Sequence, residues 1–326
     1  MSKPSSHPHP DLVSHRPVGH QPSGQRRLAQ RQSGHQSARH RPGFRDLAGG
    51  PVRVAFFGSY AWSVDYLAAL HASPRTDVVL VVTRHDDFGT GGERTFTTPV
   101  TLWCEAQASG IAVFKPRSLK GEDALAVIGA ARPDVVVSAG YSLLLPEDLY
   151  RGVAQAGINV HPSLLPQYRG ADPVRRAILD GVAETGVSLH LLTQAFDEGP
   201  LLWQHRIGID PAWNAGDVLR EAGRIAAPAL PDVVHGFVSG RLEPFDQQGE
   251  ATLAPALEGA EVEVGRTHPV ETARRLYRAL APYRFPLWVD GGRRAAIVEM
   301  DSVADARCET LTFADGEVRC RLEDVR

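Results

Sequence analysis

Short apolar runs alternate with amphipathic segments between residues 52 and 208. Continuous apolar runs at 52–58, 78–82 and 134–138 are typical of strands that are buried on both faces of a sheet. Segments with helical spacing of their apolar residues separate these runs, which indicates βαβ units and a parallel sheet. Further strands are predicted at 111–114, 157–161, 186–192 and 201–207, and helices at 60–73, 99–109, 121–131 and 173–180. We therefore predict an α/β fold with a doubly wound, Rossmann-like, mostly parallel sheet.

The pattern divides the chain into three parts. Residues 1–50 consist mainly of Ser, His, Pro, Gln, Gly and Arg without apolar periodicity, so we expect a disordered basic tail. Residues 51–240 form the α/β domain. Residues 241–326 are predicted to contain a linker, a helix and a small, shortened β-rich subdomain, with strands at 287–290, 295–300, 310–313 and 317–322.

Charge and composition narrow the class of protein. The whole chain has a net charge of −3; the tail carries eight basic residues against two Asp, so the other 276 residues carry −9. Nothing approaches the roughly 18 apolar residues of a membrane span. The three cysteines lack C-x-x-C spacing, which excludes a disulfide scaffold and a structural zinc site. The chain shows no signal-peptide pattern, so we expect a soluble cytoplasmic protein. We also expect that it binds no metal.

The first strand and turn do not match a dinucleotide-binding site. The turn contains Gly58 alone where the G-x-G-x-x-G fingerprint needs three glycines. Tyr60 and Trp62 would block the close approach of a pyrophosphate. A classical NAD site is therefore disfavoured.

Three polar residues form a candidate site. On a strand at 157–161, Asn159 and His161 share one face near the carboxyl end, where open α/β sheets bind ligands. Asp197 lies in a tight loop before the strand at 201–207. An amide can donate to an oxyanion, an imidazole can transfer protons, and a carboxylate can orient the imidazole. Each residue alone also has a structural explanation: a core histidine, a turn aspartate or a capping asparagine.

Two motifs resemble one enzyme family. Residues 159–170 read Asn-Val-His-Pro-Ser-Leu-Leu-Pro-Gln-Tyr-Arg-Gly and closely resemble the N-x-H-x-S-L-L-P-x-[YF]-[RK]-G signature of formyltetrahydrofolate-dependent formyltransferases. Residues 196–202 look like the family's D-x-G-[DP]-I-L element, and Asp197 follows His161 by 36 residues, the usual separation. Segments that are also similar to methionyl-tRNA formyltransferases are 52–70, 135–146 and 251–255.

The resemblance implies an enzyme in which an amine attacks the formyl carbon of 10-formyltetrahydrofolate. Asn159 and a protonated His161 would stabilise the tetrahedral oxyanion, and Asp197 would orient His161. The loops at 139–145 and 193–199 would hold the pterin. The residues implied to bind the folate are Gly140, Tyr141, Leu143, Leu144, Leu145, Ser163, Thr193 and Gly199, although one or two of the leucines would instead pack in the core.

The carboxyl-terminal part differs from methionyl-tRNA formyltransferases, which carry a full β-barrel domain with a basic surface. Only 41 residues follow Phe285, and residues 208–326 contain 14 Arg and no Lys against 20 acidic residues. Nucleic-acid affinity depends on cationic side chains, so a tRNA partner is disfavoured. We expect a small amine or hydroxylamine acceptor from specialised metabolism, such as hydroxyornithine for a siderophore or an amino sugar. The alternatives are methionyl-tRNA formyltransferase and formyltetrahydrofolate hydrolase; a monomer and a dimer both remain open.

Overall fold

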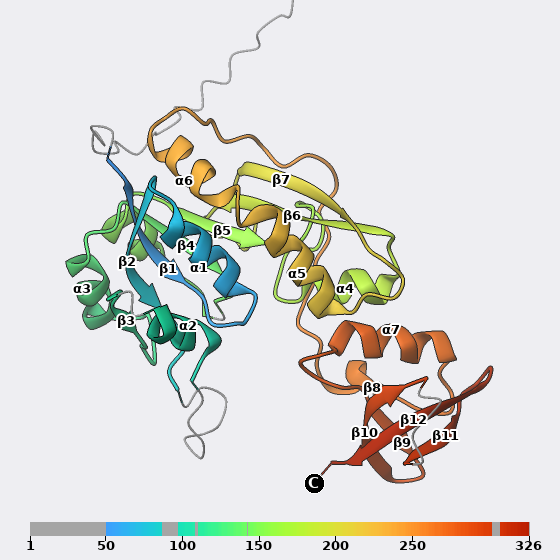
Figure 1. Cartoon of the computed structure of the whole chain (residues 1–326). Coiled ribbons are helices and arrows are strands. Elements are labelled where there is room, and N and C mark those ends of the chain that lie inside the picture. The colour runs from blue at the N-terminus through green and yellow to red at the C-terminus, as the bar shows by residue number, and fades with distance from the viewer. Residues whose placement is uncertain (1–49, 87–96, 108–109, 142, 302–306, 326) are drawn as a thin grey trace, which may run out of the picture. The chain divides into compact units, whose positions relative to one another are not determined.

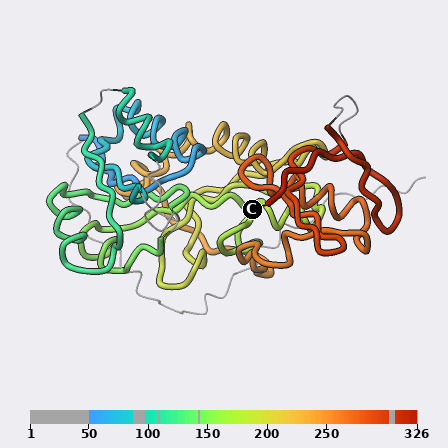
Figure 2. Tube along the Cα trace, turned by 90° about the horizontal axis from the view of Figure 1, so that it is seen from below, coloured from blue at the N-terminus to red at the C-terminus, as the bar shows by residue number. Residues whose placement is uncertain are grey.

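The computed structural model describes residues 50–86, 97–107, 110–141, 143–301 and 307–325 (Figure 1). The predicted disordered tail therefore lies outside the described residues, apart from residue 50. The described chain contains two sheets: a seven-stranded sheet in the order β3-β2-β1-β4-β5-β6-β7, and a five-stranded sheet in the order β11-β12-β10-β9-β8. Figure 2 follows the chain from the first sheet, blue to yellow, into the second, orange to red.

The first sheet is mostly parallel, which confirms the predicted fold class. Its five parallel strands are β1 (Val52–Phe57), β2 (Thr76–Val82), β3 (Val113–Phe114), β4 (Val135–Ala139) and β5 (Gly157–His161). The last two strands run antiparallel, and they are β6 (Glu184–Leu191) and β7 (Leu201–Gly208). The antiparallel β6 lies beside β5, and His161 at the carboxyl end of β5 pairs with Ser188.

Two apolar layers cover the first sheet. Alternate residues of β1 point to opposite faces: Val54 and Phe56 join one buried cluster, and Ala55 and Phe57 join another. The first cluster includes residues of α1 (Ser63–Ala72), α5 (Ala215–Ala226) and α6 (Leu230–Val238), and the second includes residues of α3 (Glu122–Ala130) and of a π-helical turn, η1 (Leu149–Val153). The remaining helices of this part are α2 (Pro99–Gln107) and α4 (Pro173–Asp180).

The second sheet has a core of its own. Trp288 and Ile297 of its strands pack with Leu276 and Leu280 of α7 (Val270–Leu280). The other elements are η2 (Gly259–Val262), β8 (Glu263–Val264), β9 (Leu287–Asp290), β10 (Arg293–Met300), β11 (Cys308–Thr312) and β12 (Glu317–Asp324).

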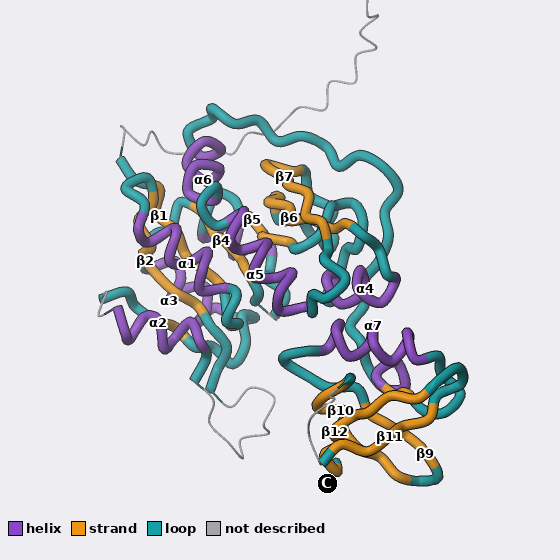
Figure 3. The backbone as a smooth tube through the Cα atoms, turned by 45° about the vertical axis from the view of Figure 1, so that its right-hand side comes forward, coloured by secondary structure: helices purple, strands orange, loops and turns teal. Residues whose placement is uncertain are grey.

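A long loop connects the two parts of the chain. The predicted boundary at residue 240 falls just after α6, where the loop drawn in teal in Figure 3 begins. Among the residues that the structure describes, no helix is both long enough and apolar enough to cross a membrane.

Candidate active site

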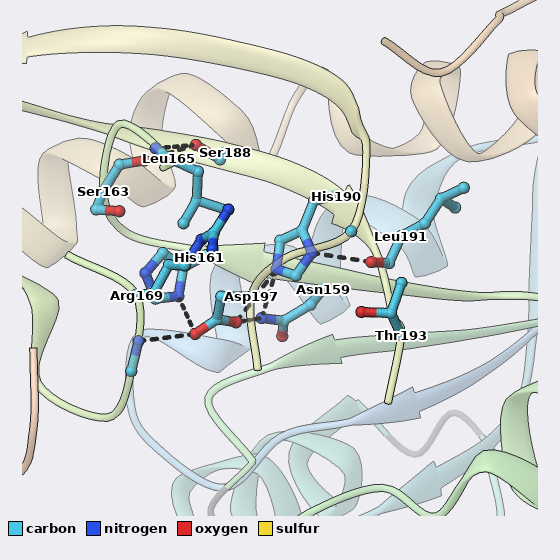
Figure 4. Close-up of polar contacts among 12 residues, drawn as sticks. Asn159, His161, Ser163, Leu165, Arg169, Ser188, His190, Leu191, Thr193 and Asp197 are labelled. Carbon is cyan, nitrogen blue, oxygen red and sulfur yellow. Dashed lines mark hydrogen bonds and ion pairs between the residues drawn. The ribbon is translucent and has the colours of Figure 1, made fainter. Parts of the chain in front are cut away.

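The three predicted residues come together at the carboxyl end of β5. Asn159 and His161 extend from the same face of β5, and Asp197 reaches them from the loop between β6 and β7 (Figure 4). His161 Nδ1 lies 3.5 Å from Asp197 Oδ2, and Asn159 Nδ2 lies 3.4 Å from Asp197 Oδ1. The carboxylate of Asp197 therefore lies between the amide and the imidazole.

A fourth residue, His190 of β6, belongs to this cluster and was missed by the sequence analysis. Its Nε2 lies 3.4 Å from Asp197 Oδ1 and 3.2 Å from Asn159 Nδ2. Its Nδ1 donates a hydrogen bond to the carbonyl of Leu191 (3.0 Å), which directs Nε2 toward the site. His190 lies directly opposite Asn159 in the antiparallel pairing of β5 with β6. The period of two along β6 could have placed His190 on one face of that strand. It points to the site only once the pairing of β5 with β6 is known.

Several contacts favour the ionised form of Asp197. Burial by itself raises the pKa of this carboxyl, but the contacts with His190, His161 and the backbone N–H of Gly170 outweigh burial. The Gly170 N–H donates to Asp197 Oδ2 over 2.9 Å. Together they lower the pKa of Asp197 from 3.8 to about 2, so the residue is a carboxylate at neutral pH.

His161 is neutral at rest in this environment. Its side chain is buried, and this burial lowers its pKa below 6.5, although the charge of Asp197 opposes the effect. In the resting site, desolvation outweighs the carboxylate and favours the neutral imidazole, whereas the protonated His161 that the resemblance implies belongs to the tetrahedral intermediate and stays a prediction. His161 Nε2 donates to the carbonyl of Tyr168 (2.8 Å), which leaves Nδ1 facing Asp197. A proton taken up on Nδ1 would therefore face the carboxylate of Asp197.

The amide of Asn159 is already occupied. Its Nδ2 approaches both His190 Nε2 and Asp197 Oδ1. To donate to an oxyanion, the amide must give up one of these two contacts. Within the described residues, no group of three or more His, Cys, Asp or Glu side chains is arranged to hold a metal ion.

The segment from β1 to α6, which includes the candidate site, matches a known protein family. Residues 52–234 match the formyl transferase family. This chain belongs to the formyl transferase family. It is 34% identical over 259 residues to methionyl-tRNA formyltransferase from Roseiflexus sp. (strain RS-1), which covers 79% of each chain. It is 36% identical over 252 residues to methionyl-tRNA formyltransferase from Thermus thermophilus, which covers 76% of this chain and 80% of the relative.

Solved structures share the fold of this formyl transferase. A sugar N-formyltransferase from Shewanella sp. FDAARGOS_354 has a TM-score of 0.60 at 18% identity and covers 78% of this chain and 99% of its own. Methionyl-tRNA formyltransferase from Clostridium thermocellum gives 0.55 at 14% identity, with coverages of 84% and 99%. HypX from Aquifex aeolicus, solved with tetrahydrofolic acid, gives 0.62 at 14% identity, with coverages of 84% and 44%.

The predicted folate loop follows β4, next to the site. Gly140 turns the chain with a φ of +67°, and the register pairs Ser138 with Asn159, so the loop begins beside the candidate cluster. Tyr141 and Leu143 are half-buried against the core, whereas the side chain of Leu144 is 61% exposed. The predicted folate contacts of these residues stay predictions.

Two of the predicted folate residues are used for internal packing. Leu145 is buried in the core beneath the loop. Ser163 is fully buried, and its hydroxyl donates to the carbonyl of Gln167 (2.7 Å). The side chains of these two residues are therefore not accessible to a ligand in this structure, because the chain itself covers them.

The other two predicted residues lie on the loop that carries Asp197. The Thr193 hydroxyl donates to the carbonyl of Ala195 (2.9 Å). Gly199 lies so close to β6 that an added Cβ would be 1.8 Å from the carbonyl oxygen of Leu191. A glycine is required there by the packing of the loop, whether or not it contacts folate.

Proposed function

We propose that this formyl transferase transfers the formyl group of 10-formyltetrahydrofolate to an amine nitrogen. The observation that carries the proposal is the cluster of Asn159, His161 and Asp197 at the carboxyl end of β5, in a chain of this family. Neutral His161 is suited to accept the proton of the amine as it attacks the formyl carbon. The resulting imidazolium is stabilised by the carboxylate of Asp197.

The remaining charge of the reaction falls on the formyl oxygen. We propose that the Asn159 amide donates to this oxygen after leaving His190 or Asp197. The tetrahedral adduct then breaks its bond to the folate nitrogen, which takes up a proton. His161 holds the proton that this step needs, so one imidazole serves both halves of the transfer.

The relatives favour methionyl-tRNA as the acceptor. Two methionyl-tRNA formyltransferases are 34% and 36% identical to this chain over more than three quarters of its length. They support the reading that the sequence analysis kept as its alternative, so methionyl-tRNA is our first candidate acceptor. The charge argument against nucleic acid is not sufficient to exclude it.

A small amine is the second candidate, and the charges around the second sheet favour it. Six arginines in this part of the chain each contact a carboxylate, and the pairs are Arg266–Asp290, Arg274–Asp301, Arg275–Glu271, Arg293–Glu309, Arg294–Glu263 and Arg321–Glu299. A phosphate backbone would have to displace these partners before it gained the counterion release that drives binding. Hydroxyornithine and amino sugars remain our examples of such acceptors.

A direct comparison of acceptors tests both candidates. The full-length protein is incubated with 10-formyltetrahydrofolate and either charged initiator methionyl-tRNA or a panel of small amines and hydroxylamines, and formyl gain is measured by mass spectrometry. Formylated methionine, with a rate that falls steeply as salt rises, supports tRNA. A formylated small amine with weak salt dependence supports the second candidate, and formate release without an acceptor indicates hydrolysis.

We also propose a cytoplasmic location for this reaction. Cys104, Cys308 and Cys320 are all free thiols, as is usual for proteins of a reducing compartment. Fractionation of the native cells, followed by detection of the protein, checks this proposal.

A further inference from the structure

The loop after α6 crosses close to the candidate site. We call residues 245–254 of this loop the strap. At one end, Phe245 exchanges two backbone hydrogen bonds with Leu201, the first residue of β7 (2.7 and 2.9 Å). At the other end, Ala254 N donates to the carbonyl of Arg169 (2.7 Å), which lies in the loop after β5. The strap is therefore fixed to the loop that follows β5 and to the first residue of β7, directly after the loop that carries Asp197.

Gln247 connects these loops through its side-chain amide. Its Nε2 donates to the carbonyl oxygens of Asp197 (2.7 Å) and Gly199 (2.8 Å). Its Oε1 accepts from Arg169, over 2.8 Å from Nη2 and 3.2 Å from Nε. Both N–H groups and both lone pairs of this half-buried amide are thus used. Its partners lie on the loop after β5 and on the loop between β6 and β7.

The turn that Gln247 contacts is a strained one. Asp197 has a φ of +54°, in the left-handed region that non-glycine residues rarely adopt. Such a conformation costs of order 1–3 kcal/mol and persists only where the surroundings fix it. The amide of Gln247 donates to the backbone carbonyl of Asp197 and so fixes the peptide bond between Asp197 and Glu198.

We propose that Gln247 is a positioning residue, which sets the location of the Asp197 carboxylate relative to His161 and His190. Gln247 lies outside the segment that matches the family, residues 52–234, and 50 residues from Asp197 along the chain. The candidate site is therefore complete only when the strap is in place. The kinetic part of this proposal rests on the proposed formyl transfer, whereas the structural part does not.

Three variants test the proposal. Gln247→Met keeps the length of the side chain and removes all four hydrogen bonds. Gln247→Glu keeps an acceptor for Arg169 but cannot donate to Asp197 or Gly199. Gln248→Met is the matched control, because the neighbouring Gln248 is exposed and donates only to the carbonyl of Asp246, within the strap (3.3 Å).

We expect both Gln247 variants to lower kcat by roughly 10- to 100-fold, the range for a small misplacement of catalytic groups. The KM for 10-formyltetrahydrofolate should change by less than about threefold, since Asp197, Gly199 and Arg169 already take the hydrogen-bonding positions of the Gln247 amide. Gln248→Met should match the wild type in both constants.

A second readout does not depend on activity. The charge of Asp197 raises the pKa of His161, so a displaced carboxylate should lower that pKa further in Gln247→Met, which adds no charge of its own. The titratable neighbours that face His161 are Asp197 and His190. NMR titration follows the imidazole signals of His161 and His190 and the carboxyl signal of Asp197 separately. An unchanged His161 titration with wild-type kcat overturns the proposal, as does a loss of stability that leaves the titration unchanged. If wild-type protein formylates no acceptor, the proposed function fails while the titration still decides the role of Gln247.

Discussion

Protonation of Asp197 in acid should make the folded protein measurably less stable. The pKa of this carboxyl is about 2 in the folded protein, against 3.8 without its neighbours. A difference of this size stabilises the folded carboxylate by about 2 kcal/mol. Because the folded pKa is lowered, this stability is fully present well above pH 3.8 and is lost as the pH falls toward 2. By pH 3, about 1 kcal/mol should already be lost.

Urea unfolding from pH 7 to pH 3 tests this reasoning. Asp197→Asn removes the titrating group, and Asp246→Asn, in an exposed part of the strap, is the matched control. The difference in unfolding free energy between wild type and Asp197→Asn should shrink by about 1 kcal/mol between pH 5 and pH 3. The change measured for Asp246→Asn over the same pH range is the reference that this decrease must exceed.

Two results would refute the argument. A constant difference between wild type and Asp197→Asn would show that the contacts with His161, His190 and Gly170 do not favour the carboxylate. A difference that grows as the pH falls would show that burial, which raises the pKa of Asp197, is the larger effect.

Three further predictions follow from the site and from the chain's organisation. His161→Ala should lower turnover by roughly 100-fold or more, the range for a lost acid–base group, and full activity in steady-state assays would contradict the mechanism. Gly170→Ala should lower the unfolding free energy by about 1–3 kcal/mol in chemical denaturation, because Gly170 has a φ of +124° and an added Cβ would lie 2.7 Å from the Ala254 carbonyl oxygen. Deletion of residues 1–48 should leave the thermal midpoint and formyl transfer nearly unchanged, and a large drop in the midpoint would show that this segment stabilises the fold.

The sequence by itself was sufficient to locate the strands of the first sheet and to predict that this sheet is mostly parallel. Continuous apolar runs at β1, β2 and β4 predicted central parallel strands, since such strands must be apolar on both faces. The helix α5 was not predicted, although its signal is local: Asn214 and Asp217 form reciprocal capping hydrogen bonds at its start.

The sequence also predicted part of the site. A period of two places Asn159 and His161 on one face of β5, and the resemblance of residues 196–202 to a family motif supplied Asp197. These residues come from short segments whose spacing carries the information. The protonation state of His161 was not predictable in this way, because it depends on how completely the fold buries the ring.

Only the tertiary structure revealed the supports of the site. His190 meets Asn159 through the register of β5 with β6, across 31 residues of sequence, and Gln247 meets Asp197 across 50. Neither residue stands in a local pattern that marks it, since one histidine on a buried strand and one glutamine in a loop are ordinary. Hydrogen bonds between distant segments depend on strand pairing and loop path. Those are decided by the packing of the whole chain, which local periodicity does not encode.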